Sequence, residues 1–446
     1  MDFLVALGGL GLLLLAGLVL RSRVRLLRSL MLPVSVIGGF VGLALGPYML
    51  DVIPADTVAV WSGLPGILIN FVFAALFLGV TIPSPGKLVS LGGPLIRFAA
   101  IVALGQLAVG MLLTWLVLGP LFSTPELFAS LLEVGFIGGH GTAAAMTPVF
   151  EGLGFEAGGA LGQMSATVGI VVGVVSGLAL VHWGVRHGHA NQLDPSRDVA
   201  DMGDMTTLVP SDERTTAATH TTRSGAIDTF TLHVSVTMVA VLIGWLLMTG
   251  IRSLHSSMSG FPLFPLAMIG GIAIQLGASR AGAATYFDRA TFERIMGLSL
   301  DVLIVAAIAS LRLDLFLQNV VPFTLLMLAG IAWTLMAFLV LAPRMIQQDW
   351  FEQSITFYGM ATAVTAIGLM LLRVVDPENR TTGAQAFAAQ ALVISPMVGG
   401  GFVTVTVPIL IVNFGLPVVL TGVVGVGLVL FLWPKPGTRP PTRVSR

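Results

Sequence analysis

Thirteen apolar segments, each long enough or nearly long enough to cross a lipid bilayer, restrict this chain to a helical membrane fold. A transmembrane helix needs about 20 apolar residues, and hydrocarbon offers no water to bond an exposed backbone. The segments lie at about 3–20, 31–48, 59–80, 92–119, 128–150 and 159–184, and then at 229–250, 262–278, 295–316, 321–342, 352–374, 385–412 and 416–433. We therefore expect an all-α polytopic membrane protein whose partner is the lipid bilayer.

The composition excludes other broad classes of protein. Of the 446 residues, 55% are hydrophobic and only 10% are charged, whereas a soluble protein carries about 25% charged residues. The net charge is zero, so it gives no indication of a nucleic-acid partner, and we expect none. The chain has no cysteine, which excludes disulfides and thiolate metal sites. Because HExxH, GxSxG, P-loop and dinucleotide-binding motifs are missing, we expect neither an enzyme nor a cofactor.

The two halves of the chain share short motifs in the same order. Residues 33–39 read PVSVIGG, and residues 265–271 read PLAMIGG. The other matches are Asn70 with Asp301, Gln163 with Gln390, Gly173 with Gly400, and Gly138–Thr142 with Gly359–Thr362. This order predicts a duplication. The expected parts are a first repeat at 1–184, a linker at 185–228, a second repeat at 229–415, and a last span with a basic tail at 416–446.

Basic residues predict how the segments cross the membrane, because lysine and arginine concentrate in cytoplasmic loops. If 128–150 and 352–374 dip into the membrane and return, 19 of the 22 basic residues face one side. If both segments cross fully, this asymmetry is lost. We therefore expect eleven spans and two re-entrant hairpins in the inner (cytoplasmic) membrane, with the N-terminus outside and the C-terminus in the cytoplasm. Five crossings per repeat make the second repeat inverted.

The linker at 185–228 is polar and contains three histidines, His187, His189 and His220. A histidine-rich tract can bind a metal ion. These histidines have no fixed spacing, so we interpret the linker as a flexible cytoplasmic connector. We expect no metal beyond a transported sodium ion.

The first hairpin contains the run Gly138-Gly139-His140-Gly141-Thr142, which interrupts a helix. Thr142 is a candidate N-cap for a helix at 143–150, and the N–H groups of Gly141, Thr142 and Ala143 would face the tip. Free amides at a helix N-terminus attract a carboxylate, so residues 139–143 form a candidate substrate site. The alternative is a kinked packing helix.

The role of His140 stays open. Its ring could donate to an anionic substrate or take part in proton coupling. Alternatively, the ring bonds backbone groups at the break. The residues alone do not favour either interpretation.

The second hairpin offers Thr362 and Thr365 between Gly359 and Gly368. Hydroxyls and freed carbonyls suit a hard cation or the polar end of a substrate. Threonine also bonds its own helix backbone without further consequence. We predict that both threonines face the first hairpin in the substrate site.

The segment after each hairpin also carries polar and helix-breaking residues, so we expect both segments to be interrupted. The first contains Gln163, Ser165, Thr167, Gly169 and Gly173, and the second contains Gln390, Ser395, Pro396 and Gly399–Gly401. Proline and glycine expose carbonyls at mid-membrane depth, which suits ion coordination. We predict an ion-coupling role for Gln163, Thr167, Gln390 and Ser395. A plain kink is the alternative.

Asp301 is the carboxylate deepest in a predicted span. A charged residue there costs roughly 2.5–3.5 kcal/mol on insertion scales, so we expect Asp301 to bind a coupling cation or proton, with pairing to Arg97 as the alternative. Glu133 lies only a turn or two below the outer surface, and we expect it to be solvated. Arg312 and Asp314 are expected to form a cluster at the outer end of their span.

Four runs carry a family resemblance: FIGGHGTAAA at 136–145, FEGLGF at 150–155, ATVG at 166–169 and PMVG at 396–399. They resemble the bacterial sodium/glutamate symporter family, over roughly 30–185 and 260–415. The resemblance implies a secondary transporter that carries glutamate inward with sodium. It also implies an elevator-like architecture, in which a mobile domain with the hairpin tips moves against a dimerising scaffold, and hence a homodimer. Gly138–Thr142 and the Thr167 region would belong to the substrate and ion site.

The second half departs from the family pattern. Residues 358–365 read YGMATAVT, without the Thr-Pro step that the family has in its second hairpin. The PMVG run is followed by Gly400 and Gly401 where the family usually has an acidic or amide residue. The chain therefore resembles a divergent member.

The leading hypothesis is sodium-coupled symport of glutamate. A second hypothesis keeps the fold but assigns another small carboxylate, or proton coupling through Asp301 or His140. A third is a passive channel, although no repeated carbonyl filter or ring of charges is visible in the sequence.

Overall fold

The structure is a computed structural model that describes residues 2–30, 32–190, 214, 216–223, 225–254, 261–377 and 380–433. In the described part, all regular secondary structure is helical and there is no strand. Much of the expected linker at 185–228 and the basic tail from residue 434 lie outside the described residues.

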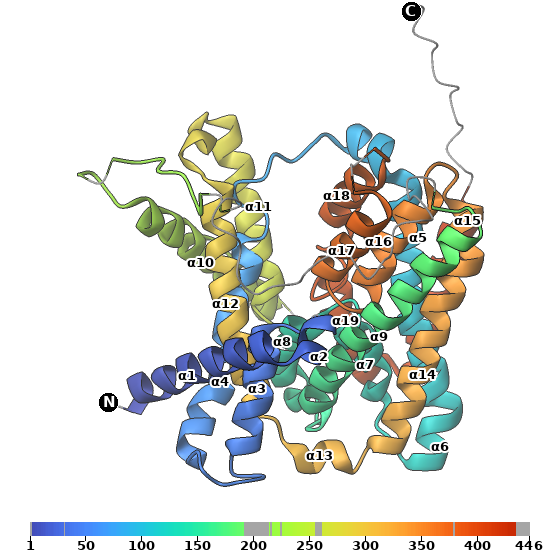
Figure 1. Ribbon diagram of the computed structural model, residues 1–446, viewed down its shortest axis with the longest axis horizontal. Coiled ribbons are helices and arrows are strands. Elements are labelled where there is room, and N and C mark those ends of the chain that lie inside the picture. The colour runs from blue at the N-terminus through green and yellow to red at the C-terminus, as the bar shows by residue number, and fades with distance from the viewer. Residues whose placement is uncertain are drawn as a thin grey trace, which may run out of the picture.

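A first helix group occupies the left of Figure 1 and combines the early helices of both halves of the chain. It consists of α1 (Asp2–Arg23), α2 (Arg25–Ser29), α3 (Val34–Leu45), α4 (Ala55–Ala75), α10 (Thr229–Leu254), α11 (Phe264–Arg280), the short η5 (Ala283–Tyr286) and α12 (Arg289–Ala309). Within it, α12 packs against both α3 and α4, and α11 packs against α4. Segments more than 200 residues apart therefore share one core.

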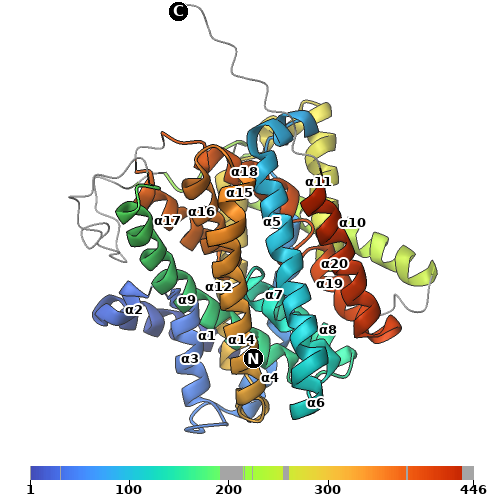
Figure 2. The same cartoon turned by 90° about the vertical axis from the view of Figure 1, so that its right-hand side faces the viewer.

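The remaining helices form the hairpin group on the right of Figure 1. Its long members are α5 (Pro85–Leu113), α8 (Gly139–Gly152), α9 (Gly158–Arg186), α14 (Val320–Met336), α16 (Trp350–Thr362), α17 (Thr365–Val375), α18 (Gly383–Ile394), α19 (Phe402–Phe414) and α20 (Leu416–Leu432). Its short members are η1 (Thr114–Leu118), α6 (Gly119–Phe122), η2 (Glu126–Ser130), α7 (Leu131–Gly135), α13 (Leu313–Leu317), η6 (Ala337–Leu341) and α15 (Ala342–Met345). Figure 2 shows α14, α5 and α20 side by side.

The helices have the length and apolarity that a bilayer requires. Among the described residues, six helices are long and apolar enough to cross a membrane, and five further apolar helices have 10–17 residues. Many large apolar side chains on α1, α10 and α20 are exposed, as expected for surfaces that face lipid. The protein is therefore a multi-pass membrane protein.

Glycines of the matched PVSVIGG and PLAMIGG runs bring equivalent helices into contact. A Cβ on Gly38 of α3 would lie 2.5 Å from the Leu13 carbonyl oxygen of α1. A Cβ on Gly270 of α11 would lie 2.2 Å from the Ala240 carbonyl oxygen of α10. Small residues let helix backbones approach closely in a membrane, so α1 and α10 occupy matching places in the two halves.

The next glycine of each run packs against the other half of the chain. A Cβ on Gly39 would lie 2.6 Å from Ile308 of α12, and one on Gly271 would lie 2.1 Å from the Ala74 carbonyl oxygen of α4. Each half therefore contributes the same pair of contacts to the first helix group.

A second structural match lies at the ends of α5 and α14. Each helix continues into a five-residue π-helical segment, η1 or η6, and then into a four-residue helix that begins Gly119-Pro120 or Ala342-Pro343. The sequences around these segments, LVLGP and LVLAP, are almost identical.

In each hairpin, the two ends of the chain lie close together. Phe128, just before α7, and Phe155, just after α8, have ring centroids 6.2 Å apart. Asp349, before α16, accepts hydrogen bonds from the backbone and side chain of Thr382, after α17, at 2.9 and 2.8 Å. The chain thus leaves each hairpin where it came in.

The expected interruption after the first hairpin is wrong, because α9 is continuous from Gly158 to Arg186. Its glycines pack against neighbours and do not break the helix. The segment after the second hairpin is interrupted as expected, between Ile394 and Phe402. The predicted span at 295–316 is also divided, because α12 ends at Ala309 and α13 follows separately.

A described part of the linker is hydrogen-bonded to Asp288, the N-cap residue of α12. Burial raises the pKa of Asp288, but hydrogen bonds from Thr219 and Thr291 outweigh it and lower the pKa to about 2. A carboxylate that caps a helix and accepts several hydrogen bonds stays ionised at neutral pH.

Replacing Gly271 by alanine should destabilise the first helix group, because the new Cβ would strike the Ala74 carbonyl of α4. Overpacking of this kind costs roughly 1–3 kcal/mol. Thermal unfolding of the purified protein measures the loss. Gly277→Ala on the same helix is the control, since its Cβ would meet nothing within 4 Å; equal melting temperatures for the two variants would contradict the packing argument.

Candidate functional site

The tips of the two hairpins meet inside the hairpin group. A Cβ on Gly139 would lie 3.3 Å from Val364 and 3.5 Å from the Ala363 carbonyl oxygen. Gly139 has φ +66°, a conformation that glycine adopts without strain. Glycine at this position therefore permits both the sharp turn and the close approach of the second tip.

α9 contacts both tips along its length. A Cβ on Gly169 would lie 2.2 Å from the Thr362 carbonyl oxygen, and one on Gly173 would lie 2.8 Å from the Thr362 hydroxyl. On the other hairpin, Gly135 lies against Ser165 so closely that a Cβ would be 2.1 Å from the hydroxyl. α9 therefore supports the tips of both hairpins.

A closed set of hydrogen bonds joins the first tip to α9. Gln163 Nε2 donates to the His140 carbonyl at 3.0 Å, and Thr167 Oγ1 donates to the Gln163 carbonyl at 3.0 Å. The Thr167 hydroxyl lies 3.0 Å from His140 Nε2. The ring nitrogen donates to that hydroxyl when it carries the hydrogen and accepts from it in the other tautomer. The His140 ring thus holds the tip against α9.

The expected N-cap at Thr142 is wrong, because α8 begins at Gly139 and Thr142 lies within its first turn. The helix begins earlier than expected, because Gly139 forms the turn between α7 and α8 and is also the first residue of α8. The free amides therefore move with the helix start: the N–H groups of His140 and Gly141 donate to no described residue. Ala143 is buried against Gly162 of α9.

Thr142 connects the first hairpin to the break between α18 and α19. Its hydroxyl donates to the Gly399 carbonyl at 2.9 Å, and a Cβ on Gly400 would lie 2.8 Å from that hydroxyl. Gly399 and Gly400 have φ values of +71° and +99°. The break therefore folds directly over the first turn of α8.

Glu133 is a site residue that the sequence analysis missed, and its expected solvation is wrong. The side chain is fully buried in α7. Its Oε1 accepts hydrogen bonds from the Gly399 N–H at 2.8 Å and from the Thr404 hydroxyl at 2.7 Å. Those partners are more than 260 residues away along the chain, so depth in the span gave no indication of burial. The available signal was a carboxylate in an apolar run just before the glycine break.

The second half contributes its predicted residues unevenly. Thr362 is buried, but its hydroxyl donates to the Tyr358 carbonyl of its own helix at 2.8 Å. Thr365 begins α17 and is exposed. Ser395 is the half-buried C-cap of α18. Gln390 is fully buried, and neither atom of its side-chain amide has a partner among the described residues, which makes it a costly position unless a polar ligand reaches it.

Asp301 does not join the hairpin tips. It is exposed on α12, although its neighbour Leu300 packs on the tip, where a Cβ on Gly141 would lie 2.9 Å from it. The alternative pairing with Arg97 is wrong, because the Arg97 guanidinium donates to the Phe431 carbonyl.

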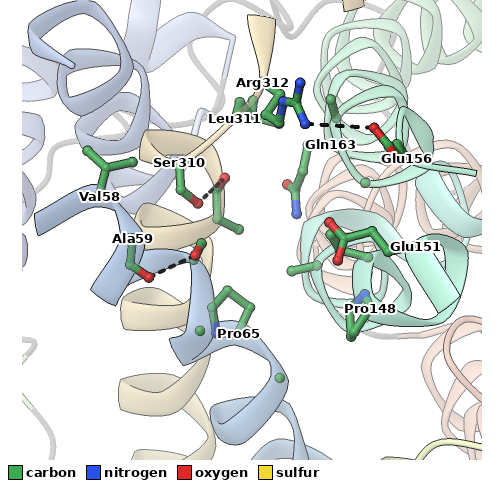
Figure 3. Close-up of a pocket in the computed structure, with 18 of the residues that line it drawn as sticks. Val58, Ala59, Pro65, Pro148, Glu151, Glu156, Gln163, Ser310, Leu311 and Arg312 are labelled. Carbon is green, nitrogen blue, oxygen red and sulfur yellow. Dashed lines mark hydrogen bonds and ion pairs between the residues drawn. The ribbon is translucent and has the colours of Figure 1, made fainter. Parts of the chain in front are cut away.

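A cavity of about 480 Å³ lies between the two helix groups and is lined by α8 residues from Ala144 onward and by Gln163 of α9. Figure 3 shows α4 residues such as Pro65 on one wall and Pro148 and Gln163 of the hairpin group on the other. Arg312 lies at its rim, 3.2 Å from Asp314, as expected, and 3.8 Å from Glu156. This volume is in the range of small-molecule sites.

Replacing Thr167 by valine should weaken substrate binding without unfolding the protein, because it removes the hydroxyl that orients His140. One neutral hydrogen bond is worth about 1 kcal/mol, so KM for the substrate should rise roughly fivefold. Transport assays over a range of substrate concentrations measure the change. The control is Thr237→Val, a buried threonine that bonds only its own helix. An unchanged KM in Thr167→Val would show that the hydroxyl does not position the tip.

Comparison with known proteins identifies the family. The model of the family described as sodium/glutamate symporter matches residues 2–361, so α17 to α20 lie beyond the match. No curated protein matches the chain. The solved structure of the sodium proton antiporter MjNhaP1 from Methanocaldococcus jannaschii at pH 8 is 16% identical, with 97% of this chain and 99% of that chain covered and a TM-score of 0.26, which is too low to carry an argument. On the family match, the chain belongs to the sodium/glutamate symporter family and is a sodium-coupled glutamate transporter.

Proposed function

We propose that this transporter binds glutamate where the two hairpin tips meet and carries it across the inner membrane by an elevator motion. The observation that supports this most is the cavity between the helix groups, which has Gln163 in its lining. Gln163 donates to the His140 carbonyl of the first tip. Only the Gln163 side chain therefore separates a substrate in the cavity from the first tip.

The first turn of α8 is the proposed receptor for a carboxylate of glutamate. The amides of His140 and Gly141 are free, and the positive end of a helix dipole favours an anion. Gly139 and Thr142 shape this turn, while Ala143 packs it against α9. Ala363 and Val364 provide the facing surface of the second hairpin, and Thr362 and Thr365 flank them in the sequence.

Sodium is proposed to bind among oxygen atoms next to this turn. Gln163 Oε1 and Gln390 Oε1 are both buried without a hydrogen-bond partner among the described residues. Thr167, Ser395 and the carbonyls of the α18–α19 break add further oxygens, which are the ligands that a hard cation prefers. Asp301, one residue from the Leu300 contact, is proposed to draw the cation toward the tip.

The proposed architecture is an inverted repeat. The paired glycine contacts and the paired π-helical segments support duplication. The basic-residue asymmetry supports an external N-terminus, a cytoplasmic C-terminus and re-entrant hairpins. In this scheme the hairpin group moves, and the first helix group forms the scaffold of a homodimer. Transport of another carboxylate, proton coupling and a passive channel remain rival functions for the uptake assay to discriminate.

Purified protein in proteoliposomes should accumulate radiolabelled glutamate when an inward sodium gradient is imposed, and not when choline replaces sodium. Thr142→Val should lower this uptake about tenfold or more at normal expression, because it releases the α18–α19 break from the turn that holds the substrate. Thr421→Val on α20 is the matched control, since that hydroxyl is exposed and bonds only its own helix.

Two results would contradict this assignment. Wild-type protein that is folded and inserted but shows no uptake under either condition would remove sodium-coupled glutamate transport. A downhill glutamate flux that does not saturate as the glutamate concentration rises would favour a channel. If Thr142→Val fails to fold, the hydroxyl is structural.

The absence of native cysteine permits a direct test of the motion. A cysteine replacing Ser310, which lines the cavity, should react with a membrane-impermeant maleimide added outside. Saturating glutamate with sodium should slow the reaction several-fold, because occupancy shifts the hairpin group away from the open cavity. Gln318→Cys, at the exposed end of α13, should react at the same rate with or without substrate. Identical protection of both cysteines, or of neither, would contradict the proposed closure.

A further inference from the structure

Glu133 is a buried carboxyl group with only half of its hydrogen-bonding capacity used. Its side chain is fully buried in α7. Oε1 accepts from the Gly399 N–H and the Thr404 hydroxyl. Oε2 is buried and has no partner among the described residues. A carboxylate oxygen left bare in a dry interior is among the most costly arrangements a protein can hold.

Within the part of the chain that the structure describes, no basic side chain forms an ion pair with this group. Of the elements packed around it, α14 and α19 contain no titratable residue, and the nearest on α8 is His140, whose Nε2 is hydrogen-bonded to the Thr167 hydroxyl. η2 adds only another acid, Glu126, whose Oε2 accepts from the Leu416 N–H. The other positive charges on elements packed against Glu133 are those of α5 and α9.

The basic residues of α5 and α9 lie far along their helices. On α5, Gly110 touches Ala129, and Arg97 is 13 residues before Gly110, or about 20 Å along the axis; Lys87 is farther still. On α9, Arg186 is 21 residues after Ser165, or about 30 Å from the level of α7. Glu133 is in no ion pair among the described residues.

We propose that Glu133 binds an exchangeable monovalent cation, a proton or a sodium ion, at the junction of the first hairpin with the α18–α19 break. Either ligand removes the buried charge and occupies the bare oxygen. The oxygens around the junction suit a hard cation as well as a proton, since the Thr404 hydroxyl contacts Glu133 and the Gly399 carbonyl is 2.9 Å from the Thr142 hydroxyl.

The proposed cation site has a direct structural consequence. Glu133 belongs to the first hairpin, and its partners Gly399 and Thr404 belong to the second half of the chain. With the cation bound, the junction is neutral and stable. Without it, an uncompensated charge loosens the junction, so the cation controls whether the hairpin stays docked. This role extends the proposed symport, on which it rests, by adding a coupling residue.

The first test needs no glutamate. The melting temperature of wild-type protein in detergent is measured against sodium concentration, with choline as replacement, and against pH. A ligand that binds the folded state raises the melting temperature. Wild-type protein should be stabilised by sodium or by acid through Glu133. Glu133→Gln is neutral and keeps an acceptor for Gly399, and it should lose whichever of these two stabilisations, by sodium or by acid, depends on Glu133. Glu293→Gln, which changes an exposed ion-pair partner, should keep it.

The result identifies the cation. If sodium is bound, the half-saturating sodium concentration in Glu133→Gln should rise about tenfold or more, as expected when a charged ligand is lost. If a proton is bound, the sodium response should persist while the acid stabilisation disappears. Parallel responses of wild type and Glu133→Gln to both sodium and pH would overturn the proposal.

Flux measurements distinguish failure of this site from failure of the transporter assignment. In proteoliposomes, labelled sodium and glutamate fluxes and luminal pH are followed together. Glu133→Gln should either move one sodium ion fewer per glutamate or abolish glutamate-dependent proton movement. A variant that transports with wild-type ratios overturns the Glu133 site alone, whereas wild-type protein without transport overturns the symport and leaves the melting test to judge Glu133.

Discussion

The close contact between α9 and the two hairpin tips is the constraint on which the hairpin group depends. A helix that stops inside a membrane leaves backbone groups without partners, and these must be covered by protein. Gly169 lets the α9 backbone cover the Thr362 carbonyl, and Gln163 donates a further hydrogen bond to the His140 carbonyl. One continuous helix thus packs against both interruptions, and its polar residues bond the first tip while its own helix stays intact.

The two tips are unequal in chemistry although they are similar in construction. The first tip has glycines, His140 and Thr142, while the second presents Ala363 and Val364 to it. Free amides are therefore concentrated on one hairpin, and the other supplies mainly an apolar cover. A site built this way orients an anion from one side and excludes water from the other, which strengthens each polar contact inside it.

The sequence predicted features that depend on local composition and missed those that depend on distant partners. The glycine run around His140 predicted a helix break, and apolar length predicted the helices. The helix start was misplaced because Gly139 adopts a positive φ and makes the turn three residues before Thr142. The burial of Glu133 could not be read from its depth, since the atoms that bury it follow Ile394 in the chain. The position of a residue along a predicted span gives only its depth in the membrane, whereas its burial depends on tertiary packing.

Gly399 offers a physical route by which cation and substrate sites can affect each other. Its N–H donates to Glu133 on α7, and its carbonyl accepts from Thr142 on α8. The two helices of the first hairpin are therefore bonded to the two polar groups of a single residue, held at φ +71°, where a larger side chain would be strained. A shift of this residue that improves one bond changes the other. Because coupling between two binding equilibria is reciprocal, a cation that docks Glu133 onto Gly399 also fixes the turn that receives the anion, and the bound anion stabilises the cation by the same free energy.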